Sequence, residues 1–289
     1  MWWRIAILVA GISGCEWGGG SDFTGNLVVP DAKKSADARK PDAPPVPIDA
    51  PPDSATMQGS GHLLLTEVAL GGAGAEFIEL ANPTTQAVDL SHYYLSDNGN
   101  YWKLPVGTAS VGLSQGDFIA QFPAGAMLAA GAVITVATGT AAAFTTAYGA
   151  APSYSIADAT ITVTASSGTP GLTDGGELVV LFVWDGASAL VKDVDMMLAG
   201  SPTPPNGLVS KSGVTQLAGT YAADADTIAN QPSAPAAGTS TKRIAAETGH
   251  EIQAGTGNGL TGHDETSEAT SATWDTTFTA PTPGSIPAF

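Results

Sequence analysis

Short apolar runs separated by Gly, Pro, Asn and Asp dominate the chain from Leu63 onward. Turn residues lie between the runs. Such regular alternation of short strands and turns is typical of an all-β sandwich or barrel. We expect strands at Leu63–Ala69, Ala75–Asn82, Ala87–Ser96, Asp117–Phe122, Ala132–Thr138, Ala159–Ala165, Glu177–Trp184, Ala189–Met196, Ser240–Ala245 and Thr273–Thr279.

Three local patterns sharpen this prediction. Every position from Leu178 to Phe182 is apolar, which indicates a central strand covered on both faces. The pair Asp185-Gly186 follows it and predicts a hairpin. Residues 141–148 place Phe144 and Tyr148 four positions apart before Gly149, so we expect a short helix that caps one end of the sandwich.

Strand alternation assigns the side chains of Glu76–Leu80 to two faces. Ile78 and Leu80 are expected to face the core, whereas Phe77 and Glu79 face the other way, where Glu79 reaches solvent or a partner. Because a buried carboxylate without a partner is costly, we expect Glu76 and Glu79 to cap turns or to accept backbone N–H bonds.

The N-terminus has a different pattern. Arg4 precedes an apolar run from Ile5 to Ile12, as in a secretory signal, and the run is shorter than the roughly 20 residues that span a bilayer. Ile12-Ser13-Gly14-Cys15 resembles the bacterial lipobox. This resemblance implies that residues 1–14 are a lipoprotein signal peptide and that Cys15 carries the lipid. The alternative is an ordinary secretory signal in which Cys15 falls at this place by chance.

Residues 15–62 show no periodic apolar pattern. The stretch Pro41–Pro52 holds six prolines in twelve residues, a density that favours extended polyproline II conformation over packing. We therefore predict a disordered linker rich in Pro, Asp and Ala that ends at His62 and leads into a domain over residues 63–289. A Pro-rich ligand for a partner's aromatic groove is the alternative.

A set of motifs occurs in order along this domain: Leu65–Ala69, Glu76–Thr84, Val88–Asp97, Phe122–Gly125, Leu128–Gly131, Gly171–Leu181 and Pro281–Gly284. Together they resemble the lamin tail domain family, and the resemblance extends from Leu63 to Phe289. It implies an immunoglobulin-like β-sandwich.

The chain departs from the family pattern in two places. His92-Tyr93 stands where the family usually has Gly-Trp, and the apolar parity shifts between Leu90 and Tyr93. One inserted residue produces such a shift, so we expect a β-bulge near Ser91-His92. The second departure is the long segment from Ser201 to Thr239, which we expect to be an exposed excursion.

The net charge and the cysteine count exclude some classes of protein function. The chain has 27 acidic and 10 basic residues and a net charge of −17. Residues 63–289 contain 20 of the acidic and 5 of the basic residues, so the sandwich is expected to be strongly acidic and to stand off an anionic envelope. This balance argues against nucleic-acid binding. A single cysteine excludes an intramolecular disulfide and a Cys-rich zinc site.

Candidate chemistry is sparse. No Gly-x-Ser-x-Gly, His-Glu-x-x-His or Walker-type loop occurs, so we predict a protein that is not an enzyme and has no cofactor. One loop offers hard oxygen ligands for Ca²⁺ close to His250 and His263, although no EF-hand spacing organises them. We interpret the loop as solvated and keep as weak Ca²⁺ candidates Asp264, Glu265, Glu268 and Asp275.

These observations predict a non-catalytic lipoprotein of the bacterial cell envelope that displays an interaction module on a flexible linker. Its partners are expected to be the membrane, through Cys15, and an envelope protein or glycan. The outer membrane is the default location, facing either the periplasm or the cell surface, because Glu16 rather than Asp follows the cysteine. The alternative is a glycan-binding sandwich, possibly assisted by Ca²⁺, that stacks sugars on Tyr93, Trp102, Trp184 or Tyr221.

Overall fold

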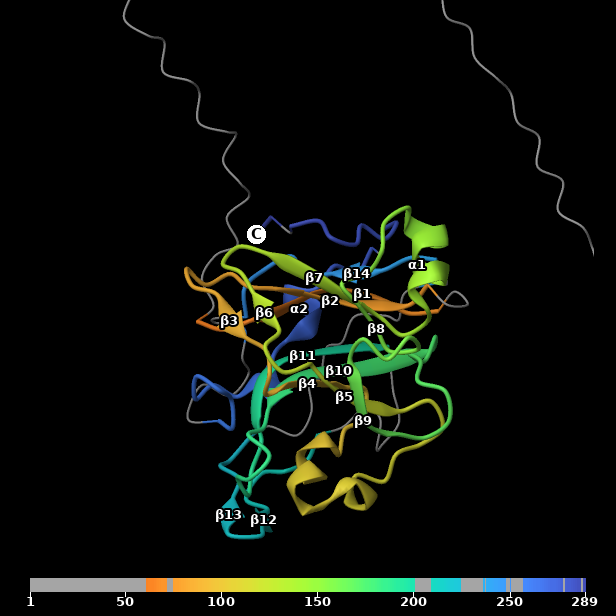
Figure 1. The fold of residues 1–289 in the computed structure, drawn as a ribbon. Coiled ribbons are helices and arrows are strands. Elements are labelled where there is room, and N and C mark those ends of the chain that lie inside the picture. Colours follow the sequence, from red (N-terminus) through yellow and green to blue (C-terminus); the bar gives the residue numbers. More distant parts are fainter. Residues whose placement is uncertain are drawn as a thin grey trace, which may run out of the picture. The chain divides into compact units, whose positions relative to one another are not determined.

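Two five-stranded β-sheets form a sandwich in the computed structural model (Figure 1). The structure describes residues 61–71, 75–200, 209–224, 236, 238–247, 250, 257–277, 279–286 and 288–289. The predicted signal peptide, Cys15 and nearly all of the predicted linker lie outside these residues. The strand pattern predicts an all-β sandwich or barrel, and the two sheets confirm the sandwich, as does the immunoglobulin-like fold that the family resemblance implies.

The first sheet has the strand order β14-β1-β2-β7-β8. Its central strands pair antiparallel, with Glu67 of β1 opposite Glu79 of β2, and only β7 and β8 run parallel. The strands are β1 (Leu64–Ala69), β2 (Phe77–Ala81), β7 (Val133–Ala137), β8 (Tyr154–Ser155) and β14 (Thr241–Lys242).

The second sheet has the order β11-β10-β4-β5-β9 and is antiparallel throughout. Its longest pair is the hairpin of β10 and β11, which encloses Asp185-Gly186 as predicted. The strands are β4 (Tyr93–Ser96), β5 (Phe118–Gln121), β9 (Thr162–Ser166), β10 (Gly176–Val183) and β11 (Lys192–Gly200).

Smaller elements surround the two sheets. Two-stranded ribbons are formed by β3 (Val88–Asp89) with β6 (Met127–Leu128) and by β12 (Thr215–Gln216) with β13 (Gly219–Thr220). The α-helices are α1 (Ala141–Tyr148) and α2 (Thr270–Thr273), and the 3₁₀ helices are η1 (Tyr101–Val106), η2 (Thr108–Ser110) and η3 (Glu265–Ser267). Among the described residues, no helix has the length and apolar character needed to cross a membrane.

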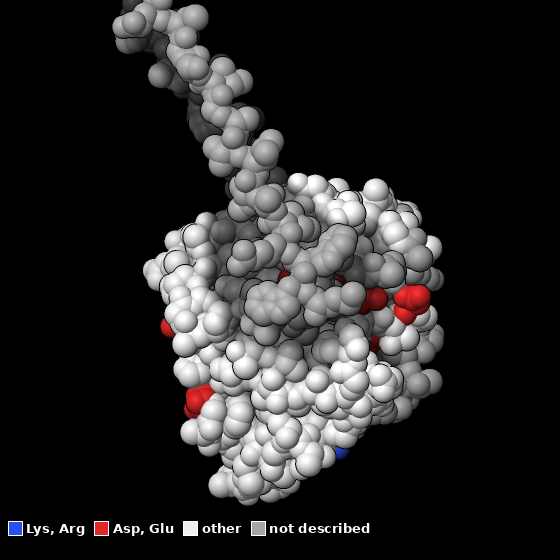
Figure 2. Space-filling view, turned by 45° about the vertical axis from the view of Figure 1, so that its right-hand side comes forward, with Lys and Arg blue, Asp and Glu red and all other residues white. Residues whose placement is uncertain are grey.

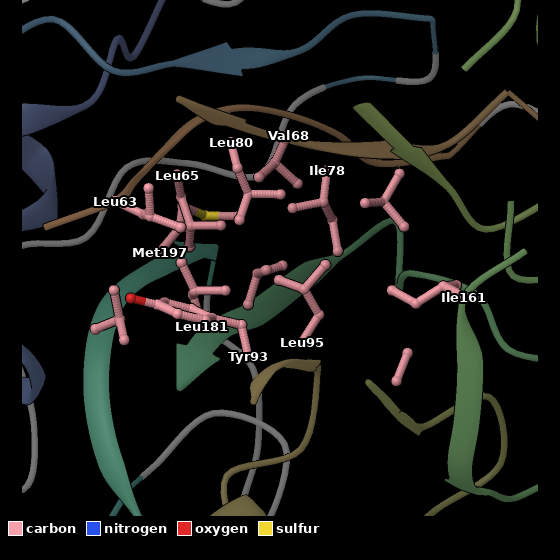
Figure 3. Packing of buried hydrophobic residues seen from close by; sticks show 14 of the residues in the cluster. Leu63, Leu65, Val68, Ile78, Leu80, Tyr93, Leu95, Ile161, Leu181 and Met197 are labelled. Atoms are coloured by element: carbon pink, nitrogen blue, oxygen red, sulfur yellow. The ribbon is translucent and has the colours of Figure 1, made fainter. Parts of the chain in front are cut away.

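The main core lies between the sheets (Figure 3). Ile78 and Leu80 point into it from the first sheet and Leu181 from the second, as strand alternation predicts. Each such side chain removed from water stabilises the fold by about 1.5–3 kcal/mol. β10 is central and apolar on both faces, because Leu178, Val180 and Phe182 pack in a second cluster on the outer side of its sheet.

The outer faces are covered by helices and loops. Helix α1 begins after Thr140, whose side chain accepts the Ala143 N–H, and ends at Gly149, where φ is 77°. Its Phe144 packs edge-to-face on Phe77 with ring centroids 5.7 Å apart. The helix was predicted correctly, but it covers the outer face of the first sheet instead of capping an end of the sandwich.

Three sequence predictions need correction. The expected strand Ala87–Ser96 is two strands in different sheets, β3 and β4, because a turn at Ser91-His92 closes with the bond from Tyr93 N–H to Leu90 O. This turn, and not the predicted β-bulge, causes the apolar side chains to change face between Leu90 and Tyr93. Residues Thr273–Thr279 form isolated bridges rather than a strand. The described part of the excursion, residues 209–224, packs Tyr221 against the outer face of the second sheet.

A pair of glutamates holds the C-terminal residues on the first sheet. Glu79 accepts hydrogen bonds from the Gly284 N–H (2.6 Å) and from Thr66 Oγ1 (2.9 Å). Glu67, opposite it, accepts the Thr282 N–H at 2.9 Å. Glu79 is therefore buried and does not reach solvent, although it accepts a backbone N–H as predicted; Glu76 likewise accepts the Leu172 N–H. Burial raises the pKa of Glu79 to about 8, and the adjacent Glu67 adds to the increase.

Glu79→Gln should flatten the dependence of stability on pH. Between its ordinary pKa and about 8, the folded protein keeps a proton on Glu79 that the unfolded chain releases, so stability falls as pH rises through this window. The free energy of unfolding should therefore fall between pH 5 and pH 8 by about 2–4 kcal/mol less in Glu79→Gln than in the parent protein. Urea unfolding at the two pH values measures it.

Asp185→Asn is the matched control. Asp185 is exposed, and hydrogen bonds from Ser188 lower its pKa to about 2, so it is ionised at both pH values. An unchanged pH slope in Glu79→Gln would show that Glu79 is also ionised in the folded protein.

Candidate functional site

Charged side chains are concentrated inside the domain. Figure 2 shows a largely uncharged face with a few separate acidic residues. Many of the acidic residues that the sequence places in this domain are therefore internal, and the expectation that the domain stands off an anionic envelope stays a prediction. The buried carboxylates belong to Glu67, Glu79, Asp97, Asp117, Glu177, Asp193, Asp195, Asp224, Glu247, Asp264, Glu265 and Glu268, and the buried cations to Lys211 and Arg243.

Arg243 lies at the centre of the largest group. Its Nη2 donates to both carboxylate oxygens of Asp195, at 2.6 and 2.7 Å, and its Nη1 donates to Glu268 at 2.8 Å. Its Nε donates to the Leu65 carbonyl oxygen, and its guanidinium lies over the Trp274 ring. Each of these hydrogen bonds ends on a buried acceptor. Together they hold the planar guanidinium in one orientation.

The local sequence explains why Arg243 points inward. It follows β14, which pairs with β1, and the backbone N–H of Arg243 donates to the Thr66 carbonyl oxygen. Lys242, one position earlier, lies on the opposite face and remains partly exposed. Strand alternation thus separates two adjacent cations into one buried and one surface residue.

His62, Glu247 and Glu265 extend this group at the start of β1. His62 Nε2 lies 2.5 Å from Glu247 Oε1 and 3.8 Å from Glu265 Oε1. The exposed fractions of the three residues are 4%, 1% and 1%. We name the six side chains His62, Asp195, Arg243, Glu247, Glu265 and Glu268 the buried charge cluster.

The cluster shifts the pKa values of its members. Burial raises the pKa of Asp195 to about 8, although the Arg243 charge acts against this. Burial, followed by the charge of Glu247, raises the pKa of Glu265. Burial alone would lower the pKa of His62, but its hydrogen bond with Glu247 and the charge of that residue raise it. Neighbouring carboxylates also contribute to each of the three increases, after burial in the case of Asp195 and Glu265.

A second buried ionic group surrounds Lys211. Its Nζ lies 2.6 Å from Asp193 Oδ2 and 2.9 Å from Asp224 Oδ2, and Tyr101 Oη donates to Asp193 at 2.5 Å. Asn258 donates to Asp224. These contacts attach residues 209–224 to the beginning of β11.

A groove of about 670 Å³ lies outside these groups. It is lined by the loop before β11, residues 188–191, and by the Gly-rich loop of residues 257–262. Gly259 forms part of its wall, and a side chain on Gly259 would place its Cβ 2.8 Å from Glu265 Oε1. The absence of a side chain at this position therefore lets the loop close over the buried charge cluster.

The structure divides the sequence-predicted calcium candidates. Asp264, Glu265 and Glu268 are buried, so the interpretation of this loop as solvated is wrong for these three residues. Asp275 lies apart, is only half-buried, and accepts hydrogen bonds from Thr277. Sequence reasoning missed His62, Glu247, Asp195 and Arg243, because they are far apart along the chain and share no motif. Cys15 lies outside the described residues.

The aromatic residues considered for sugar stacking are largely internal. Tyr93, Trp102 and Tyr221 are buried, and Trp102 packs edge-to-face on Tyr221. Only Trp184 is partly exposed, and its Nε1 donates to the Ser188 carbonyl oxygen. A sugar-binding platform needs several accessible rings, and these four residues do not provide one.

Arg243→Met should destabilise the domain by about 3–5 kcal/mol, because it leaves Asp195 and Glu268 buried without their cation. Lys242→Met is the matched control. Lys242 is partly exposed and 3.9 Å from Glu67, so its loss should cost less than about 1 kcal/mol. Urea unfolding of both variants measures the difference, and equal losses would contradict a central role for Arg243.

Comparisons with known proteins gave one family match and a distant structural similarity. Residues 56–195 match the family model of the Lamin Tail Domain. No curated protein matches the chain. Among solved structures, a DUF4876 family protein from Bacteroides thetaiotaomicron VPI-5482 is similar at 14% identity and a TM-score of 0.35, covering 79% of this chain and 72% of that one. The predicted extension of the resemblance to Phe289 stays a prediction. We therefore identify residues 56–195 of this chain as a lamin tail domain.

Proposed function

We propose that this protein is a non-catalytic lipoprotein of the bacterial cell envelope, in which a lipid on Cys15 anchors a lamin tail domain through a Pro-rich linker. One observation carries the proposal. The single cysteine of the 289-residue chain follows a short apolar run, at the acceptor position of Ile12-Ser13-Gly14-Cys15. A lipid at this position, joined by a second acyl chain on the new N-terminus, would hold the protein stably at a membrane.

The placement of the titratable groups supports a non-catalytic role. Catalysis needs an acid, base or nucleophile that a substrate can reach. The side chains of the buried charge cluster are at most 4% exposed, and those around Lys211 are also buried. Their contacts join β1, β11, β14 and the C-terminal residues, which is a structural role.

The proposed role is to present the domain to an envelope component. Many of the charged side chains are buried, and the face in Figure 2 is largely uncharged, which favours protein contacts over phosphate binding. The linker would give the domain reach from the membrane. Residence in the outer membrane, on either side, is part of this proposal.

Cys15→Ser should release the protein from the membrane. In a bacterial host that receives a clickable fatty acid, the parent chain should incorporate the label and partition into the detergent phase of Triton X-114. The variant should do neither, because Cys15 is the sole thiol. Ser13→Ala is the matched control, since a small residue is retained and the cysteine is untouched. Membrane association that persists in Cys15→Ser would contradict the anchor.

Crosslinking in intact cells tests the presentation role. The anchored chain should form a discrete adduct with an envelope component, and the released Cys15→Ser protein should lose it, because anchoring holds the domain near its partner. Immunoblotting and mass spectrometry identify the adduct. A chain that forms no adduct in either state, or that turns over a substrate as purified protein, would contradict a non-catalytic interaction module.

A further inference from the structure

Three side chains of the buried charge cluster have the arrangement of metal ligands. One ligand atom from each of His62, Glu247 and Glu265 lies within 4.8 Å of the others. They come from a position two residues before β1, from the segment after β14 and from the 3₁₀ helix η3, so the fold assembles the group from distant parts of the chain. No other group of this kind occurs among the residues that the structure describes.

The orientation of His62 is fixed in the way that metal-binding histidines usually are. Its Nδ1 lies 2.8 Å from the carbonyl oxygen of Leu63, to which an N–H at this position donates. The proton on Nδ1 leaves Nε2 as the nitrogen that faces Glu247 and Glu265. A ring nitrogen held by a backbone carbonyl, with the second nitrogen directed at the ion, is the common arrangement in metal sites.

The carboxylate oxygens supply an independent observation. Both oxygens of Glu265 and Oε2 of Glu247 are buried and have no hydrogen-bond partner among the described residues. Buried polar atoms are almost always hydrogen-bonded, and ionised ones are costly otherwise. Arg243 does not relieve this deficit, because its hydrogen bonds go to Asp195, Glu268 and backbone carbonyls. Of these unsatisfied atoms, Glu265 Oε1 lies 3.8 Å from His62 Nε2, and Glu247 contacts the same nitrogen through its other oxygen, Oε1.

We propose that His62, Glu247 and Glu265 bind a divalent transition-metal ion of the Zn²⁺ class. The imidazole nitrogen distinguishes this site from Ca²⁺ and Mg²⁺ sites, which use oxygen ligands, and one nitrogen with two carboxylates suits Zn²⁺ or Mn²⁺. Two positive charges balance the two carboxylates that Arg243 does not pair. The site is enclosed, so the ion has a structural role that fastens residues 247 and 265 to the start of β1.

A path for the ion runs past Gly259. This residue belongs to the wall of the 670 Å³ groove and also packs against Glu265, with no side chain between them. Displacement of the loop of residues 257–262 would therefore open the site to the groove. This inference is independent of the lipid anchor, because a chain that is not lipidated would hold the same ion.

The test is zinc binding by the full chain, purified in detergent, stripped with EDTA and then titrated with ZnCl₂. We expect one Zn²⁺ per chain by calorimetry and by elemental mass spectrometry, with an increase in unfolding temperature. Glu265→Gln should weaken zinc binding more than about 100-fold, since loss of even a residue that only supports a ligand can cost that much. Cobalt in place of zinc should give visible absorption that Glu265→Gln lacks.

Stability without metal separates a binding defect from a folding defect. Glu265→Gln keeps the shape of the side chain and removes a buried charge, so its unfolding temperature after EDTA treatment should equal or exceed that of the parent. His62→Gln should also lose zinc binding, whereas His92→Gln, which alters an exposed histidine, should bind as the parent does. His92 is the control for adventitious surface binding.

Three outcomes would overturn the proposal. The first is a stripped chain that takes up no zinc and shows no change in unfolding temperature. The second is zinc binding that survives in both Glu265→Gln and His62→Gln. The third is equal competition by CaCl₂ at the same concentration, which would contradict the transition-metal assignment.

Discussion

The contact between Arg243 and Asp195 joins the two sheets, and much of the structure depends on it. Arg243 follows β14 in the first sheet, and Asp195 belongs to β11 in the second. Asp195 Oδ2 also accepts the N–H of Leu65 in β1 at 2.6 Å, while Arg243 Nε donates to the carbonyl oxygen of the same residue. An ion pair therefore spans the interior of the sandwich beside the apolar core, and both of its members also bind the backbone of β1.

An ion pair in this position has a large desolvation cost. Removing either partner is far more harmful than removing both, because one charge would be left buried. The pair is therefore weak evidence for stability in itself, but it specifies how the sheets align, since only one register brings the guanidinium to both Asp195 and Glu268. The cost also explains why Glu265, a further buried acid near the pair, has a raised pKa.

Features of the fold that depend on residues close together in the chain could be predicted from the sequence. Strand alternation placed Ile78 and Leu80 in the core, the uninterrupted apolar run identified β10 as central, and Thr140 and Gly149 delimit the helix that the sequence predicts. Features that depend on contacts between distant residues could not be predicted. Nothing in the sequence near Ser91 distinguishes a bulge from a turn that leads the chain from the β3–β6 ribbon into the second sheet, because both change which face the following side chains point to.

The sequence did not reveal which charged residues are buried, for a related reason. Composition counts carboxylates but does not reveal which ones share a cation or a backbone N–H, and these pairings join residues such as Glu67 and Thr282 that are far apart in sequence. Asp264, Glu265 and Glu268 looked like part of a solvated loop because their Gly- and Thr-rich surroundings lack apolar periodicity. Polar contacts, and not an apolar stripe, bury this segment.

The same contacts show where the folded unit extends. The family match ends at Asp195, whose cation is Arg243 and whose neighbour Asp193 pairs with Lys211. Both cations lie beyond the matched residues, as does β14, the edge strand that covers β1. A fragment ending at Asp195 would hold two buried aspartates without their cations and an open sheet edge. The residues after the match are thus required to neutralise and complete the domain that precedes them.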